Sequence, residues 1–241
     1  MTLITGGTVA ELRELAGKQA IVTGVTDAAA VQETVDDVVD SAGRLDLMFD
    51  NAGIVLGGDT ELLSPEQWNA IIDVNVRGVV HGVAAAYPHM VRRRGGHIVN
   101  TASAAGLMAA GRLASYVMSK HAVVGLSLAL RSEAAAHGVG VTALCPGAVE
   151  TPLLDKGWVG GVDGREFYRM GQGGGGFYPA DRLADAALRS VVRNKALLVV
   201  PRRVRLGWAL HRLSPALLQR LAERFLAEQR AAHPSLTRGN L

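Results

Sequence analysis

Residues 97–120, HIVNTASAAGLMAAGRLASYVMSK, decide how this chain folds and where its polar groups gather. The apolar run that opens the stretch predicts a buried β-strand, and Ser103 follows at its carboxyl end. Tyr116 and Lys120 come four residues apart within a helical pattern at 114–137. Side chains four apart share one face of a helix, so we expect the phenol and the ammonium to be neighbours. A strand end and a helix bearing two ionisable groups are therefore predicted to meet.

Short apolar runs alternate with longer helical patterns over most of the chain. Strands are predicted at 2–5, 19–23, 45–49, 97–101, 139–144 and 197–200, and helices at 9–16, 28–42, 65–90, 114–137 and 180–193. Strands that are apolar throughout and separated by helices indicate a parallel sheet covered on both faces. We therefore predict an α/β fold with a six-stranded, doubly wound parallel sheet. Ser64-Pro65-Glu66-Gln67 predicts a capped helix start.

The chain is predicted to hold one α/β domain at 1–200 and a basic, amphipathic helical tail at 201–241 that is not an independent domain. Apolar residues in the tail recur at spacings of three and four, at positions 206, 210, 213, 217, 221 and 225. Ser214 and Pro215 are predicted to end one helix and start the next. Two interpretations stay open: a hairpin packed on the body or on another subunit, or a tail lying on an anionic membrane surface with Trp208 at the interface.

Composition excludes several classes of function. With 49% hydrophobic and 20% charged residues, the chain is not mainly disordered, and 5% aromatic residues argue against a stacking platform for single-stranded nucleic acid. Eleven of the 25 basic residues lie at or after position 189, so the positive charge belongs to the tail, and we predict no nucleic-acid partner. The single cysteine excludes an intramolecular disulfide, and the seven histidines lack metal-ligand spacing with acidic residues. No metal site is predicted.

The sequence pattern also shows no targeting signal. No apolar run reaches the length of a membrane-spanning helix, and Met1 is not followed by a secretory-signal pattern. We therefore predict a cytoplasmic protein, and contact of the tail with a membrane surface stays open as an alternative.

The group formed by Ser103, Tyr116 and Lys120 is suited to moving a proton on or off a carbonyl or alcohol oxygen. A free tyrosine has a pKa near 10, which makes it a poor proton donor and acceptor at neutral pH. A neighbouring cation favours the phenolate and moves the tyrosine pKa towards the working range. A serine hydroxyl arriving from the end of the preceding strand could hydrogen-bond the same oxygen.

Two further turns are expected at the same edge of the sheet. The sequence NAG at 51–53 follows one predicted strand, and PGAVET at 146–151 follows another. Ligands of open α/β sheets bind outside the carboxyl ends of the strands. Three strand ends and the Tyr116/Lys120 helix are therefore predicted to form one binding site.

Several of these motifs, in this order, resemble those of the short-chain dehydrogenase/reductase family over about residues 17–200. The resemblance rests on the turn at 51–53, Asn75 in Asn-Val-Arg-Gly, Ser103 thirteen residues before Tyr116, Lys120, and Pro-Gly-x-x-x-Thr at 146–151. It implies a Rossmann-like fold, an NAD or NADP cofactor, and a homo-oligomer in which the helices at 65–90 and 114–137 pair across subunits.

The resemblance also implies a role for each matching residue. Tyr116 would be the general acid/base, Lys120 would lower its pKa and hold the nicotinamide ribose, and Ser103 would orient the substrate oxygen. Asn75 would support a water-mediated proton path. Besides Tyr116 and Lys120, the implied cofactor-binding residues are Pro146, Gly147, Val149 and Thr151 at the nicotinamide, and Asn51, Ala52 and Gly53 at the adenosine side.

The amino-terminal region departs from the family pattern. Members open with Thr-Gly-x-x-x-Gly-x-Gly entering a helix, whereas here residues 5–8, TGGT, run straight into the helical pattern at 9–16. One αβ unit, with the remaining glycines, is absent. The strand at 19–23 is then expected to pair directly with the strand at 2–5 and to leave a shallow, solvent-open adenosine end. Gly24 and Asp50 also differ from the family's usual acid and asparagine.

We predict an NAD(P)-dependent dehydrogenase or reductase that acts on a secondary alcohol or carbonyl. A loop at 155–178, with nine glycines and five aromatic residues, is predicted to be a lid or binding loop rather than a floppy insertion. This loop and the apolar tail favour a lipophilic substrate over a sugar. The alternative function is a cofactor-impaired family member that serves as a binding or scaffold protein, including one at a membrane surface.

Overall fold

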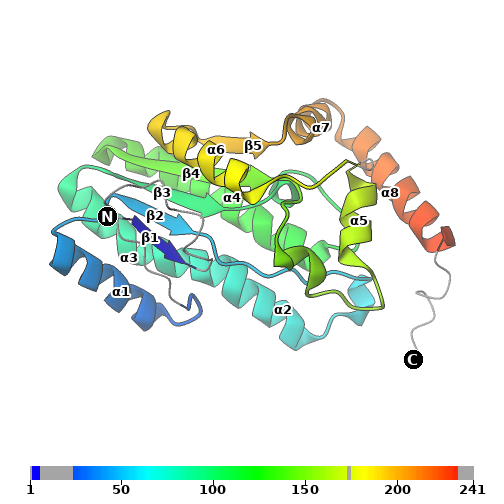
Figure 1. Ribbon diagram of the computed structural model, residues 1–241, viewed down its shortest axis with the longest axis horizontal. Helices are drawn as coiled ribbons and strands as arrows, with labels where there is room; N and C mark the ends of the chain where they lie inside the picture. The colour runs from blue at the N-terminus through cyan, green and yellow to red at the C-terminus, as the bar shows by residue number, and fades with distance from the viewer. Residues whose placement is uncertain (1, 6–23, 173–174, 233–241) are drawn as a thin grey trace.

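The computed structural model describes residues 2–5, 24–172 and 175–232, in which five parallel strands form one sheet with helices on both faces (Figure 1). The strands lie in chain order: β1 (Thr2–Thr5), β2 (Leu47–Asp50), β3 (Gly96–Thr101), β4 (Val139–Pro146) and β5 (Leu197–Val200). Each pairs in parallel with the next. The predicted doubly wound α/β fold is confirmed. The predicted helix at 9–16 and the sixth strand at 19–23 lie outside the described residues.

The sheet is buried on both faces because successive side chains of each strand point to opposite sides. Met48, Ile98 and Val141 pack in a core formed with three helices, α1 (Ala28–Ala42), α3 (Gly78–Arg93) and α4 (Ala114–Ala134). Their neighbours Phe49 and Val99 pack in a second core, under α6 (Ala180–Val192). This explains why the strands read as continuous apolar runs rather than as alternating ones.

The prediction of one continuous helix at 65–90 is wrong, because a π turn divides it into two. The structure has α2 (Pro65–Ile72), then a five-residue π turn, η3 (Asp73–Arg77), and then α3. The start is as predicted, because Ser64 and Gln67 form a capping box. A π turn widens a helix by one residue and is common at functional sites, and this one is centred on the buried Asn75.

The glycine-rich loop predicted at 155–178 contains a helix, α5 (Gly164–Gly171). Asp163 caps it by accepting a hydrogen bond from the backbone N–H of Glu166 at 2.9 Å. Phe167 is buried and its ring centroid lies 5.1 Å from that of Trp158. The cap and the aromatic packing stabilise a helix that the glycine content alone disfavours.

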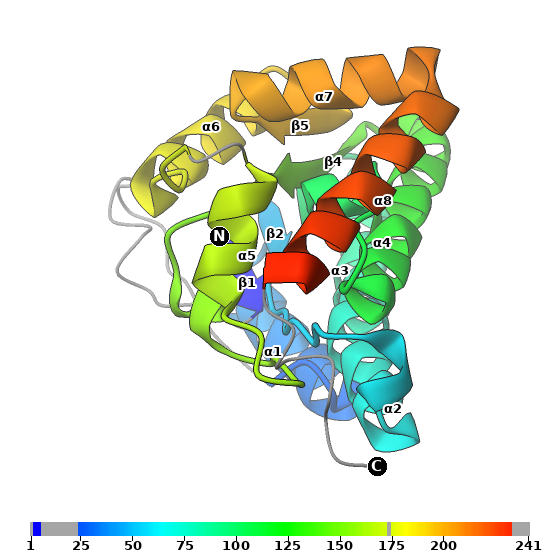
Figure 2. The same ribbon diagram turned by 90° about the vertical axis from the view of Figure 1, so that its right-hand side faces the viewer.

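The tail forms two helices, α7 (Arg202–Leu213) and α8 (Pro215–Ala232), separated at Ser214 as predicted. Figure 2 shows α7 crossing over β5 and α8 running down the outside beside α5. Val204 and Trp208 of α7 pack against the main core, and Phe225 of α8 packs with Phe167. Among the described residues, no helix has the length and apolar content needed to span a membrane.

The close approach of α3 to β2 requires glycine at position 82. A Cβ atom there would overlap Asp50 Oδ1 and lie 2.7 Å from Met48 Cε. We expect Gly82→Ala to lower the free energy of unfolding by about 1–3 kcal/mol, because a fully packed core cannot absorb the added methyl group. Urea unfolding followed by circular dichroism measures this change.

Gly125→Ala is the matched control, because Gly125 is also in a helix but has no atom within 4 Å of the added Cβ. It should keep or raise stability by up to about 1 kcal/mol, through helix propensity. Equal stability of the Gly82 variant and the unmodified protein would contradict the packing described here.

Candidate active site

The carboxyl ends of β2, β3 and β4 meet at one edge of the sheet, because the three strands are parallel neighbours. Asn51 follows β2, and its Oδ1 accepts a hydrogen bond from Thr101 Oγ1 at the end of β3, at 3.0 Å. Ser103 follows β3 and Gly147 follows β4. The three predicted strand-end turns are thus brought together as expected.

Helix α4 adds Lys120 to this edge. The side chain is buried, and its Nζ donates a hydrogen bond to the carbonyl oxygen of Thr101 at 2.7 Å. The same ammonium lies 5.6 Å from the ring centroid of Tyr116, which confirms the expected proximity. Lys120 therefore links α4 to the end of β3.

Ser103 and Tyr116 line one pocket. Ser103 begins the short 3-10 turn η4 (Ala104–Gly106), and its Oγ accepts a hydrogen bond from the N–H of Ala105 at 3.1 Å. The turn is packed tightly on α4, because a Cβ at Gly106 would lie 2.5 Å from the carbonyl oxygen of Lys120. Serine and tyrosine hydroxyls can thus reach the same bound oxygen atom.

Burial is the largest influence on the pKa values of Tyr116 and Lys120. It raises the pKa of Tyr116 to about 12, although a side-chain interaction with Ser103 acts in the opposite direction. Burial lowers the pKa of Lys120 to about 8. Burial opposes the implied lowering of the Tyr116 pKa by Lys120, which stays a prediction, and the Lys120 ammonium is bonded to the backbone of Thr101. A protonated phenol is the form that can donate a proton.

Asn75 is buried inside the π turn and ties three segments together. Its Nδ2 donates to the carbonyl oxygen of Ile54 at 2.9 Å and to Ser119 Oγ at 3.0 Å, and its Oδ1 accepts from Ile54 N–H at 2.8 Å. Ser119 Oγ in turn donates to the carbonyl oxygen of Tyr116 at 2.8 Å. Asn75 thus positions the turn after β2 against α4. The water-mediated path implied for it stays a prediction.

The cofactor-binding residues implied by the resemblance fall into two groups. Gly147 lines the same pocket as Ser103 and Tyr116, and its N–H donates to the carbonyl oxygen of Val200 at 2.8 Å. Pro146 closes β4 beside it, while Val149 pairs with Tyr178. Neither Val149 nor Thr151 is among the described residues that line the pocket.

The turn after β2 fits a sugar hydroxyl next to Lys120. A Cβ at Gly53 would lie 3.4 Å from Lys120 Nζ and 3.5 Å from Asn75 Oδ1, so glycine keeps space open beside the ammonium. Ala52 lies between Asn51 and Gly53 in this turn. Lys120 and the space at Gly53 therefore fit a ribose hydroxyl of a dinucleotide, and the adenosine-side role implied for residues 51–53 stays a prediction. The TGGT turn after β1 falls mostly outside the described residues.

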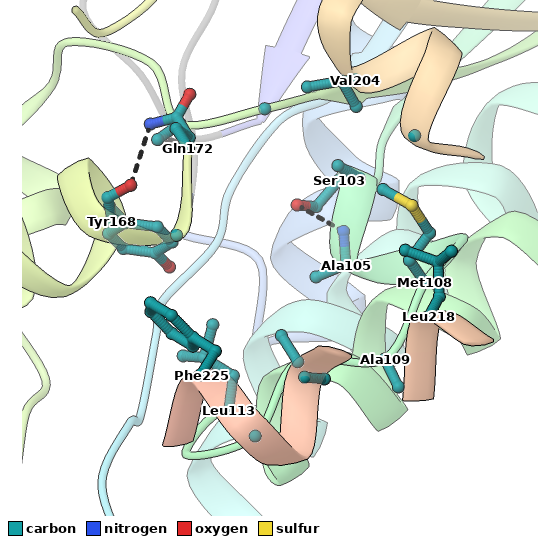
Figure 3. Close-up of a pocket in the computed structure, with 18 of the residues that line it drawn as sticks. Ser103, Ala105, Met108, Ala109, Leu113, Tyr168, Gln172, Val204, Leu218 and Phe225 are labelled. Carbon is teal, nitrogen blue, oxygen red and sulfur yellow. Dashed lines mark hydrogen bonds between the residues drawn. The ribbon is translucent and has the colours of Figure 1, made fainter. Parts of the chain in front are cut away.

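The pocket itself is apolar and has a volume of about 520 Å³. Figure 3 shows Ser103 on one side, Tyr168 of α5 on another, and Phe225 and Leu218 of α8 closing it. Phe225 is held by Phe167, with 6.1 Å between the ring centroids. One margin is polar, where Gln172 accepts a hydrogen bond from Arg203 at 2.8 Å.

Sequence reasoning missed the part that α8 plays in this pocket. The apolar spacing in the tail includes Leu217, Leu221 and Phe225, and the pocket is lined by Leu221 and Phe225 together with Leu218 and Ala222, which the spacing did not single out. Their spacing of four and three is a helical face, so the signal was present in the sequence. The sequence did not indicate which part of the protein this face contacts.

Comparison with known proteins places the chain in a family. The short chain dehydrogenase family matches residues 6–158, and these include Ser103, Tyr116 and Lys120. The chain belongs to the short-chain dehydrogenase family, as the resemblance of its motifs predicts.

Individual relatives agree with this assignment. The chain is 35% identical over 149 residues to the 3-oxoacyl-(acyl-carrier-protein) reductase FabG of Thermotoga maritima, an alignment that covers 61% of each chain. Among solved structures it resembles a short-chain dehydrogenase/reductase of Burkholderia phymatum in complex with NAD, with a TM-score of 0.72, 28% identity, and 83% and 76% of the two chains covered.

A gluconate 5-dehydrogenase of Burkholderia cenocepacia J2315, in complex with NADP and tartrate, matches with a TM-score of 0.66 and 28% identity, over 75% of this chain and 72% of that one. The chain spans between about half and 71% of the length of the curated relatives that it matches.

The buried amide of Asn75 generates a pH-dependent prediction. In Asn75→Asp, the carboxyl group would face the carbonyl oxygen of Ile54, so burial and this acceptor raise its folded-state pKa above the unfolded value of about 4. When protonated it can still donate to Ile54, and when ionised it cannot. The loss of stability should therefore be small near pH 4, where the unfolded carboxyl group begins to ionise, and grow to about 1–3 kcal/mol near pH 8.

Urea unfolding at both pH values measures this difference. Asn69→Asp, at an exposed position on α2, is the matched control and should show no such dependence. A loss that is the same at both pH values would contradict the hydrogen bonding assigned to Asn75.

Proposed function

We propose that this protein is an NAD(P)-dependent oxidoreductase that interconverts a lipophilic carbonyl compound and its secondary alcohol. The observation that carries the proposal is the shared pocket of Ser103 and Tyr116, with the ammonium of Lys120 behind the tyrosine. Family membership supports the reaction class, and the fit of Gly53 and Lys120 to a ribose supports the cofactor. Relatives solved with NAD and with NADP leave both cofactors open for this chain.

Each residue has a task in carbonyl reduction. Ser103 donates a hydrogen bond to the carbonyl oxygen and holds it in place, and Tyr116 donates its phenolic proton to the same oxygen. Lys120 holds a ribose hydroxyl and keeps α4 at the end of β3 through Thr101. A bound NADH or NADPH supplies the hydride that reaches the carbonyl carbon. Burial raises the pKa of Tyr116, so the phenol is protonated at neutral pH and has a proton to donate.

Tyr116→Phe tests this proposal. Removing the hydroxyl should lower kcat for ketone reduction by about 10²–10⁴-fold, because the proton donor is lost while the ring still fills its space. Oxidation of NADH and of NADPH is followed by absorbance with apolar ketones as substrates. The melting temperature should not change.

Tyr87→Phe is the control, because Tyr87 packs against the main core outside the pocket. It should keep full activity. If Tyr116→Phe retained full activity, Tyr116 would not be the general acid.

The pocket lining supports a lipophilic substrate. Side chains of Met108, Leu218 and Phe225 surround the space next to Ser103, and they provide no hydrogen-bond partners for a sugar. The name of the Thermotoga relative refers to a 3-oxoacyl group, which is a carbonyl on an apolar chain. Both observations support this substrate class.

A series of methyl ketones of increasing chain length tests the substrate class. Each methylene buried in the pocket is worth about 0.8 kcal/mol, so kcat/KM should rise about fourfold per added carbon until the pocket is full. Phe225→Ala should flatten this dependence. Val192→Ala, at an exposed position on α6, should not. A kcat/KM independent of chain length would contradict a lipophilic substrate.

The scaffold alternative is separated from the enzyme by calorimetric titration. Micromolar binding of NADH or NADPH supports the enzyme, and no heat of binding with either supports the scaffold. The predicted homo-oligomer and cytoplasmic location stay predictions. Exposed Val80, Met118 and Leu128, on the two helices expected to pair, support the oligomer.

A further inference from the structure

The outer side of the α7–α8 hairpin carries an unusual number of exposed leucines. We call this set the leucine face: its members are Leu206, Leu210, Leu213, Leu217 and Leu221, with exposed fractions of 65, 57, 84, 52 and 48%. They are five of the eleven large hydrophobic residues exposed within the described part of the chain. Their spacing of three and four puts them on one face of each helix. Contiguous exposed apolar surface marks an interaction site.

Four of the five leucines lie outside the pocket, and Leu221 is exposed and also lines it. The leucine face is not needed to hold the hairpin on the body, because other residues of the hairpin do this. Val204 and Trp208 pack against the main core, and Phe225 packs on Phe167. Arg230 near the end of α8 pairs with Asp59 at 2.6 Å. The hairpin is thus fixed at the outside of the molecule (Figure 2), and its leucine face is exposed.

Charge distinguishes the ligands that could cover the leucine face. Between residues 202 and 232 there are seven arginines and two glutamates, a net charge of +5, whereas the whole chain carries +3. Arg202, Arg205, Arg220 and Arg224 are exposed and make no ion pair within the described part of the chain. Leucines that alternate with free arginines are typical of helices that lie in a membrane interface.

We propose that the leucine face docks on an anionic lipid surface. A second copy is the disfavoured occupant, because a two-fold contact places the same patch on both sides and would bring two hairpins of charge +5 together. An anionic bilayer offers an apolar layer for the leucines and negative headgroups for the arginines. The exposed leucines and the unpaired arginines of the hairpin would then both have a partner.

Docking would also place the pocket next to the bilayer. Leu218 and Phe225 of α8 close the pocket, while Leu217 of the same helix belongs to the leucine face. A lipophilic substrate partitioned in the bilayer would then have a short way to Ser103. This consequence rests on the proposed function, whereas the docking itself does not.

Vesicle flotation with the full chain tests the proposal, with no cofactor or substrate added. The protein should float with vesicles of phosphatidylcholine and phosphatidylglycerol and stay behind with phosphatidylcholine alone. The double variant Leu210→Ser/Leu213→Ser should lower the bound fraction about tenfold or more, because two exposed leucines no longer enter the interface. Added salt should weaken binding, since the arginine contribution is screened.

Val192→Ser is the matched control, because Val192 is 87% exposed on α6 outside the hairpin. It should float like the unmodified protein, and thermal unfolding should show that all variants fold. Absence from both kinds of vesicle, equal binding to both, or equal binding of the double variant would overturn the proposal. Dissociation of an oligomer by the double variant, in sedimentation without lipid, would instead assign the face to a second copy. None of these results depends on oxidoreductase activity.

Discussion

The hydrogen bond from the Lys120 ammonium to the carbonyl oxygen of Thr101 is the constraint on which the site depends. A buried ammonium without a partner is very costly, so this bond fixes how α4 is placed against the end of β3. The rotation of α4 then determines where the phenol of Tyr116 lies. Gly106 allows the turn after Ser103 to approach the backbone of Lys120, which completes the group. A change in any of these contacts would separate the two hydroxyls that must reach one oxygen atom.

The rest of the pocket is supplied by segments far along the chain. Helix α5 contributes Tyr168 and α8 contributes Leu218 and Phe225, and the rings of Phe167 and Phe225 hold the two helices together. The polar chemistry therefore comes from the sheet and α4, while the apolar walls come from later helices. Because the polar groups and the apolar walls come from different segments, the walls can change without a change in Ser103, Tyr116 and Lys120.

Sequence and structure agree where local spacing decides the outcome. The spacing of four from Tyr116 to Lys120 and the capping box at Ser64 act within one or two helical turns, so both could be predicted. The π turn around Asn75 and the helix α5 could not, because the first depends on contacts with Ile54 from another segment and the second on ring packing between Phe167, Trp158 and Phe225. The ionisation of Tyr116 is a similar case, because its burial raises the pKa and opposes the effect of the neighbouring cation. Spacing indicates a neighbouring cation, but burial depends on the whole fold.

Transfer of deuterium tests the central claim most directly. The protein is incubated with a long-chain methyl ketone and with NADH or NADPH carrying deuterium at the transferable C4 position, and the alcohol is analysed by mass spectrometry. The unmodified protein should place one deuterium at the carbinol carbon, and Tyr116→Phe should form labelled alcohol at least about a hundredfold more slowly. Binding of the dinucleotide without any labelled alcohol across a panel of apolar ketones, or equal labelling by the variant, would contradict the claim.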